Sequence, residues 1–146
     1  MESGFSFKRL IFAFIAGFIA VLVFHQGMLA ILYSVGFTAR SPFPMQPTKP
    51  FGIPVIFSLA FWGGVWGILF ALIDRRFPRG AAYWVWTLIF GALGPSLVAW
   101  LLVAALKGQP LGGGWKGSVV ITGLMVNGAW GVGCALLLRA FSLSSK

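Results

Sequence analysis

Long apolar stretches, separated by short segments that contain proline, glycine and charged residues, form the pattern of this 146-residue sequence. A helix needs about 20 consecutive, mostly apolar residues to cross the hydrocarbon core of a bilayer. Stretches of at least this length predict transmembrane helices at 10–35, 53–73, 82–106 and 117–138. Because the connections are short, we predict an all-α, polytopic membrane protein folded as one compact four-helix bundle, with a single domain over 1–146.

Composition supports a membrane protein and an intact first helix. Hydrophobic residues make up 59% of the chain and charged residues 9%, whereas soluble domains contain about 25% charged residues. Lys8 and Arg9 precede the first apolar stretch, as basic residues do in a signal peptide. That stretch is too long for a signal peptide and lacks a clear small-residue cleavage site, so we predict that it is an uncleaved helix.

The distribution of Lys and Arg predicts the orientation. Seven of the 11 basic residues lie at the N-terminus, in the second connection and at the C-terminus, and four lie in the first and third connections. Basic residues are enriched on the cytoplasmic side of a membrane. We therefore expect a multi-pass protein of the bacterial inner membrane with both termini in the cytoplasm. The net charge of +9 is spread over the helix ends, which favours anionic lipids over nucleic acid as partners.

Small residues recur at helical spacing and predict how the helices pack. Gly63 and Gly67 form a GxxxG pair in the second helix, and Gly91, Gly123 and Gly131 continue similar stripes in the third and fourth. Such faces let helices approach closely in lipid, where packing must supply the association. We expect ordinary packing within the bundle. The alternative is a homo-oligomer, or a larger membrane complex, formed through a stripe that is left unused.

Polar residues within the apolar stretches form a second pattern. His25 and Gln26 interrupt VLVFHQGMLAIL, and polar groups inside a bilayer are costly enough to require a reason. Counting about 1.5 Å per residue from each helix centre places His25, Ser58, Ser96 and Asn127 within roughly 8 Å of the midplane. We favour a dry, hydrogen-bonded layer. The alternative is a polar cavity open to the periplasm, in which His25 binds or shuttles a proton.

The connection at 37–52 is rich in proline, which forbids a helix there and favours an extended path. It also contains the apolar residues Phe37, Phe43, Met45 and Phe51. Two placements fit this composition equally well. The segment either folds over the periplasmic end of the bundle or lies at the level of the lipid headgroups.

Acidic and nucleophilic residues are scarce. Glu2 and Asp74 are the only acids, and Asp74 follows the second helix, where the helix dipole disfavours a carboxylate. We therefore predict a basic partner and assign Arg9, in a solvated ion pair at the membrane interface. One His, two acids and the single Cys134 supply neither a nucleophile with its base nor a set of metal ligands. We expect no catalytic site, no metal and no cofactor.

Three segments carry a resemblance: HQG at 25–27, PFGIPVIFSLAFWGGVWG at 50–67, and VNGAWG at 126–131. With these, nearly the whole chain resembles small uncharacterised four-helix inner-membrane proteins of bacteria. The resemblance implies a location and an architecture but no activity. The leading hypothesis is a non-enzymatic membrane protein, acting as an accessory subunit or a self-associating bundle. The alternative is a small transporter or channel-like protein that uses the polar layer.

Overall fold

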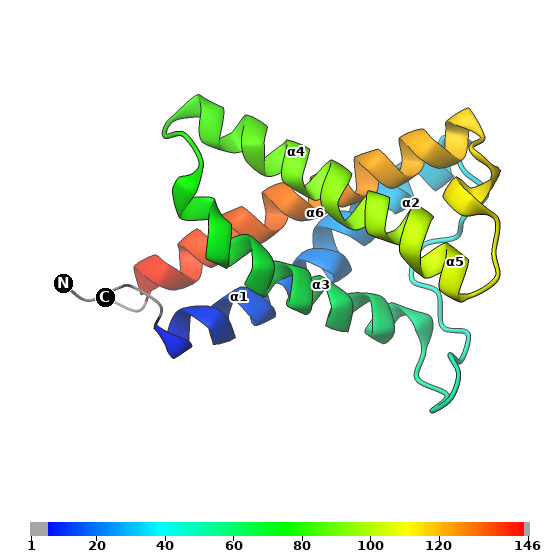
Figure 1. Ribbon diagram of the computed structural model, residues 1–146, viewed down its shortest axis with the longest axis horizontal. Coiled ribbons are helices and arrows are strands. Elements are labelled where there is room, and N and C mark those ends of the chain that lie inside the picture. Colours follow the sequence, from blue (N-terminus) through cyan, green and yellow to red (C-terminus); the bar gives the residue numbers. More distant parts are fainter. Residues whose placement is uncertain (1–5, 145–146) are drawn as a thin grey trace.

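The computed structural model describes residues 6–144, and within them the chain is helical with no strand (Figure 1). Its four long helices are each long and apolar enough to cross a membrane. The predicted all-α class and the four membrane-length helices are therefore confirmed. Glu2 and Lys146, both used in the sequence interpretation, lie outside the described residues.

The four long helices contain local changes of helix type. The first comprises α1 Phe7–Ala20, a π-helical turn η1 Val21–His25 and α2 Gln26–Ser34. The second comprises α3 Val55–Ile73 and a 3₁₀ turn η2 Asp74–Arg76. The third comprises α4 Ala81–Leu97, a π-helical turn η3 Val98–Val103 and α5 Ala104–Leu106. After the short 3₁₀ helix η4 Leu111–Gly114, the fourth long helix is α6 Gly117–Ser144.

The first and fourth long helices extend beyond the apolar stretches from which they were predicted. The first begins at Phe7 rather than residue 10, and the fourth ends at Ser144 rather than residue 138. Charged residues at a helix end can extend to the interface while their backbone stays helical. Arg139 is the first residue of the extension of α6, and its guanidinium lies 4.1 Å from the centre of the Tyr83 ring.

Both ends of the bundle carry connections (Figure 1). The start of α1, the end of α6 and the 77–80 connection lie at one end, called here the terminal end. The 35–54 and 107–116 connections lie at the opposite, distal end. Helix α1 packs against α3 and α6, and α4 packs against α6.

Glycines bring the backbones of packed helices into contact. A Cβ atom built on Gly91 would lie 2.6 Å from the Asn127 carbonyl oxygen and 2.8 Å from the Gly131 Cα atom. One built on Gly63 would overlap the Val21 side chain and lie 2.8 Å from the Gly17 carbonyl oxygen. These faces are therefore used inside the chain, between α1 and α3 and between α4 and α6.

The centre of the bundle is filled by side chains. Trp130 is 2% exposed, and its indole N–H donates to the Gly17 carbonyl oxygen at 3.0 Å. Cys134, Ala135 and Ala16 pack in the same cluster and are fully buried. An indole that hydrogen-bonds across a helix interface fixes the register of α6 on α1 as well as filling space.

Candidate functional site

His25 and Gln26 form the first polar cluster, at the junction between η1 and α2. The side chain of Gln26 is fully buried, and His25 is 7% exposed. The Gln26 amide nitrogen lies 3.0 Å from His25 Nδ1, and its amide oxygen accepts a hydrogen bond from the Phe43 backbone N–H at 2.6 Å. Because Phe43 N–H can only donate, it fixes the amide orientation. The amide nitrogen then donates to Nδ1, and neutral His25 carries its proton on Nε2.

The Phe43 bond shows that the first connection folds back along the bundle. Gln26 lies eight residues before Ser34, the end of α2, or about 12 Å deeper along the helix. After Ser34 the chain must therefore turn back toward the middle of the bundle, so that Phe43 can reach Gln26. Pro44 accepts a hydrogen bond from the Ile56 N–H at 2.9 Å, which ties the same segment to the start of α3. Irregular backbone at membrane depth is tolerated where it is buried in protein or lines a cavity.

Side chains of this connection behave differently from its backbone. Phe43 is 49% exposed, Met45 59% and Phe51 84%. The segment thus has features of both placements considered from sequence. Its backbone is held on the bundle by Gln26 and α3, while its apolar side chains point outward.

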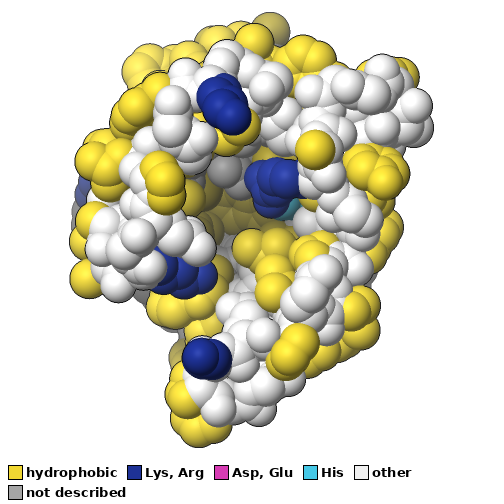
Figure 2. All heavy atoms as spheres, turned by 90° about the vertical axis from the view of Figure 1, so that its right-hand side faces the viewer, with side chains coloured by type: hydrophobic (Ala, Val, Ile, Leu, Met, Phe, Trp, Pro, Cys, Tyr) yellow, Lys and Arg dark blue, Asp and Glu magenta, His cyan; other side chains and the backbone are white. Residues whose placement is uncertain are grey.

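Arg40 lies close to this cluster. Its guanidinium is near enough to act electrostatically on the His25 ring, and the residue is exposed. Burial by the surrounding protein nevertheless lowers the pKa of Arg40 from its ordinary value. Figure 2 shows a recess at the distal end, with Lys and Arg side chains around it and hydrophobic side chains on its floor. We call this recess the distal hollow.

A second polar cluster joins α4 to α6. Asn127 donates from its amide nitrogen to Ser96 Oγ at 2.9 Å, and Ser96 donates to the Gly123 carbonyl oxygen at 3.4 Å. Ser96 is fully buried. These bonds lock two helices whose backbones are already in contact. Thr87, earlier in α4, has a buried hydroxyl oxygen without a hydrogen-bond partner among residues 6–144.

The polar residues expected in one layer are therefore divided. His25 pairs with Gln26 at the distal hollow, Ser96 pairs with Asn127 between α4 and α6, and Ser58 has no side-chain hydrogen bond within the described part of the chain. Counting from helix centres assumed that all helices are centred on one plane. The observed pairs follow which parts of the chain are in contact: Gln26 meets the first connection, and α4 packs against α6.

At the terminal end, Asp74 links three helices. Arg9 Nη2 donates to Asp74 Oδ1 at 2.7 Å, and the Tyr83 hydroxyl donates to Asp74 Oδ2 at 3.2 Å. Arg139 stacks over the Tyr83 ring and adds the fourth helix. The structure thus brings Arg9 and Asp74 together, but the side chains are only 18% and 10% exposed, so the pair is partly buried rather than solvated. Sequence reasoning missed Tyr83, although its place at the start of the third helix put it at the same surface.

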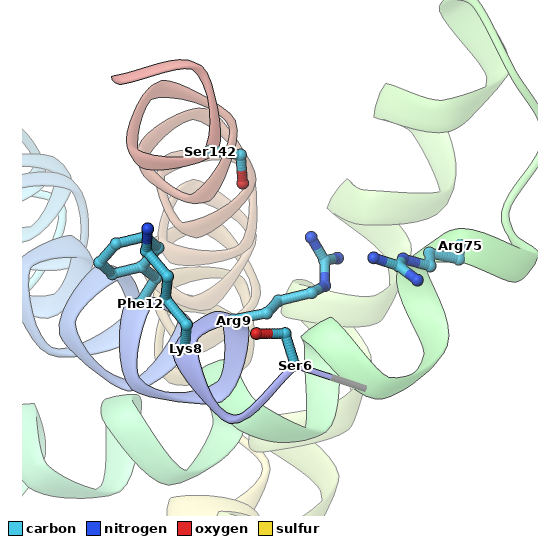
Figure 3. Close-up of a pocket in the computed structure, with 6 residues that line it drawn as sticks. All are labelled: Ser6, Lys8, Arg9, Phe12, Arg75 and Ser142. Atoms are coloured by element: carbon cyan, nitrogen blue, oxygen red, sulfur yellow. The ribbon is translucent and has the colours of Figure 1, made fainter. Parts of the chain in front are cut away.

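Beside this network lies a cavity of about 260 Å³, lined by Ser6, Lys8, Arg9, Phe12, Arg75 and Ser142 (Figure 3). Figure 3 shows the guanidinium groups of Arg9 and Arg75 extending toward one another. Lys8 Nζ lies 5.5 Å from the centre of the Phe12 ring. The cavity is basic and lies where the start of α1 meets the ends of α3 and α6.

The two ends of the bundle thus offer charge and hydrogen-bond donors. Within residues 6–144, no three His, Cys, Asp or Glu side chains are grouped as metal ligands would be. Asp74 is engaged with Arg9 and Tyr83, and His25 lies at the distal end near Arg40. Comparison of the chain with protein-family models, curated proteins and solved structures finds no match.

Proposed function

We propose that the chain is a non-enzymatic, multi-pass protein of the bacterial inner membrane that acts by binding, as an accessory bundle. The observation that carries the proposal is the filled centre of the bundle, where Trp130 is buried and hydrogen-bonded to Gly17. A centre closed in this way supports binding at the ends of the bundle rather than conduction through it. The glycine faces are used within the chain, which favours membership in a larger membrane complex over self-association through those faces.

The terminal end fits contact with anionic lipids of the cytoplasmic leaflet. Lys8, Arg9 and Arg75 line its cavity, Arg76 ends the turn η2, and Arg79 lies in the adjoining connection. Basic clusters at the cytoplasmic ends of membrane helices attract anionic headgroups, by about 1 kcal/mol for each Lys or Arg near the surface. This placement rests on both termini lying in the cytoplasm.

The orientation can be tested with reporters fused after Lys146. We expect green fluorescent protein at this position to fluoresce and alkaline phosphatase to be inactive, because the basic residues favour a cytoplasmic C-terminus. Fusions within the 107–116 connection should give the opposite pair of results. Active phosphatase after Lys146 would invert the orientation and move the terminal cavity to the periplasmic side.

A flux measurement separates binding from transport. Protein reconstituted into liposomes that contain a pH-sensitive dye should admit protons no faster than protein-free liposomes do under an applied potential. The reason is that Trp130 and its neighbours close the middle of the bundle and the Ser96–Asn127 pair is internally hydrogen-bonded. Proton entry above background, abolished by His25→Leu, would instead support the alternative of a small transporter or channel-like protein.

A further inference from the structure

The distal hollow combines positive charge with an apolar floor (Figure 2). The two connections at this end contain no Asp or Glu, and their basic residues are Arg40, Lys49, Lys107 and Lys116. A recess with this composition has no anion of its own to neutralise it. An amphiphile with a negative headgroup and apolar tails complements both the rim and the floor.

Arg40 is the basic residue that acts electrostatically on His25. It lies three residues before Phe43, whose N–H is held by the buried Gln26. The guanidinium is exposed to a ligand, and the only acid among residues 6–144, Asp74, is bound to Arg9 at the opposite end. Arginine presents several N–H donors in one plane, which match two oxygens of a phosphate group.

His25 offers a second donor at the inner margin of the hollow. The ring is more than nine-tenths buried, and a histidine side chain is visible beside a basic residue in Figure 2. Gln26 occupies Nδ1, so the proton of neutral His25 is on Nε2. Among the described residues, Nε2 has no hydrogen-bond partner. The protein does not enclose this atom completely, so it remains accessible.

We infer that the distal hollow binds the phosphate-bearing headgroup of an anionic phospholipid, with Arg40 as the principal contact and His25 Nε2 as a second donor. The acyl chains would cover the apolar floor of the hollow and continue onto the exposed apolar surface, to which Phe43 and Met45 belong. A soluble phosphate would use the same donors but would leave the apolar floor uncovered. The inference rests on the proposed function, because it assumes that the bundle lies in a bilayer and acts by binding.

The test uses the full chain in an uncharged detergent, with short-chain phosphatidylglycerol as the ligand and native mass spectrometry as the readout. Phosphatidylcholine of the same chain length tests the charge, and glycerol phosphate tests the tails. We expect phosphatidylglycerol to bind at least about tenfold more tightly than either. Arg40→Gln should weaken its binding about tenfold or more. Arg79→Gln removes the same charge from the terminal end and should weaken the binding by no more than about fivefold, which is the surface attraction of a single basic residue.

Two results would overturn the inference. Equal losses in Arg40→Gln and Arg79→Gln would reduce the binding to a general attraction between a basic protein and an anionic lipid. Glycerol phosphate that binds as tightly as phosphatidylglycerol would show that the tails contribute nothing, and the lipid assignment would fail. Neither result changes the flux expected in liposomes, whereas proton flux would contradict the proposed function without bearing on Arg40.

Discussion

Replacing Gly67 by leucine should lower the free energy of unfolding by about 3 kcal/mol or more, because the new side chain would meet backbone atoms. A Cβ atom at this position would overlap the Ala13 carbonyl oxygen and lie 3.1 Å from the Gly17 Cα atom. Backbone cannot move aside as a flexible side chain can, so α1 and α3 must separate. In lipid no hydrophobic force restores the lost contact. Unfolding in mixed micelles, followed by tryptophan fluorescence, measures the change.

Gly27→Leu is the matched control. Gly27 lies in α2, and a Cβ atom added to it would have no other atom within 4 Å, so the same substitution meets open space. Removing a glycine from a helix interior should leave the stability unchanged or raise it by about 0.5–1 kcal/mol. Leu59→Ala, on a partly buried side chain of α3, should cost less than Gly67→Leu. Equal stabilities for Gly67→Leu and Gly27→Leu would show that α1 and α3 do not depend on this face.

The helices and their small-residue faces were predictable because both are local properties of the sequence. The length of an apolar stretch predicts a membrane-length helix, and spacing along that helix predicts which residues share a face. Gly63 and Gly67 share a face in any helical arrangement. Which helix covers that face was not predictable, because the order of packing depends on contacts such as Trp130 with Gly17, which are 113 residues apart.

The polar clusters were less predictable than the helices. The residues were identified as a group, but their partners depend on helix lengths and on where the first connection returns. Gln26 binds the Phe43 N–H, and a backbone group leaves no mark in the sequence that could identify it as a partner. In the sequence, Arg40 was only one of the four basic residues in the first and third connections. Its proximity to His25 depends on how the first connection folds back on the bundle, which spacing along the sequence does not predict.

The terminal network leads to the second large effect, at Asp74. Asp74→Leu should lower the free energy of unfolding by roughly 2–4 kcal/mol, because Arg9 would keep its charge while losing its carboxylate partner. The pair is partly buried, with side chains 18% and 10% exposed, so water can replace the lost contact only in part. The Arg9 Nε atom already lacks a hydrogen-bond partner within the described residues, which leaves this guanidinium especially dependent on Asp74. Unfolding in mixed micelles again provides the measurement.

Two further variants separate charge from the neutral hydrogen bond. Tyr83→Phe removes the 3.2 Å bond to Asp74 Oδ2 and keeps the ring under Arg139, so it should cost only about 0.5–1.5 kcal/mol. Arg9→Met combined with Asp74→Leu removes both charges and should recover part of the stability that Asp74→Leu loses, because no uncompensated charge then remains. If the double variant were less stable than Asp74→Leu by the full cost of Arg9→Met alone, the two residues would act independently. The ion pair would then not hold the terminal end together, and its packing against Phe12 and Tyr83 would be the source of stability instead.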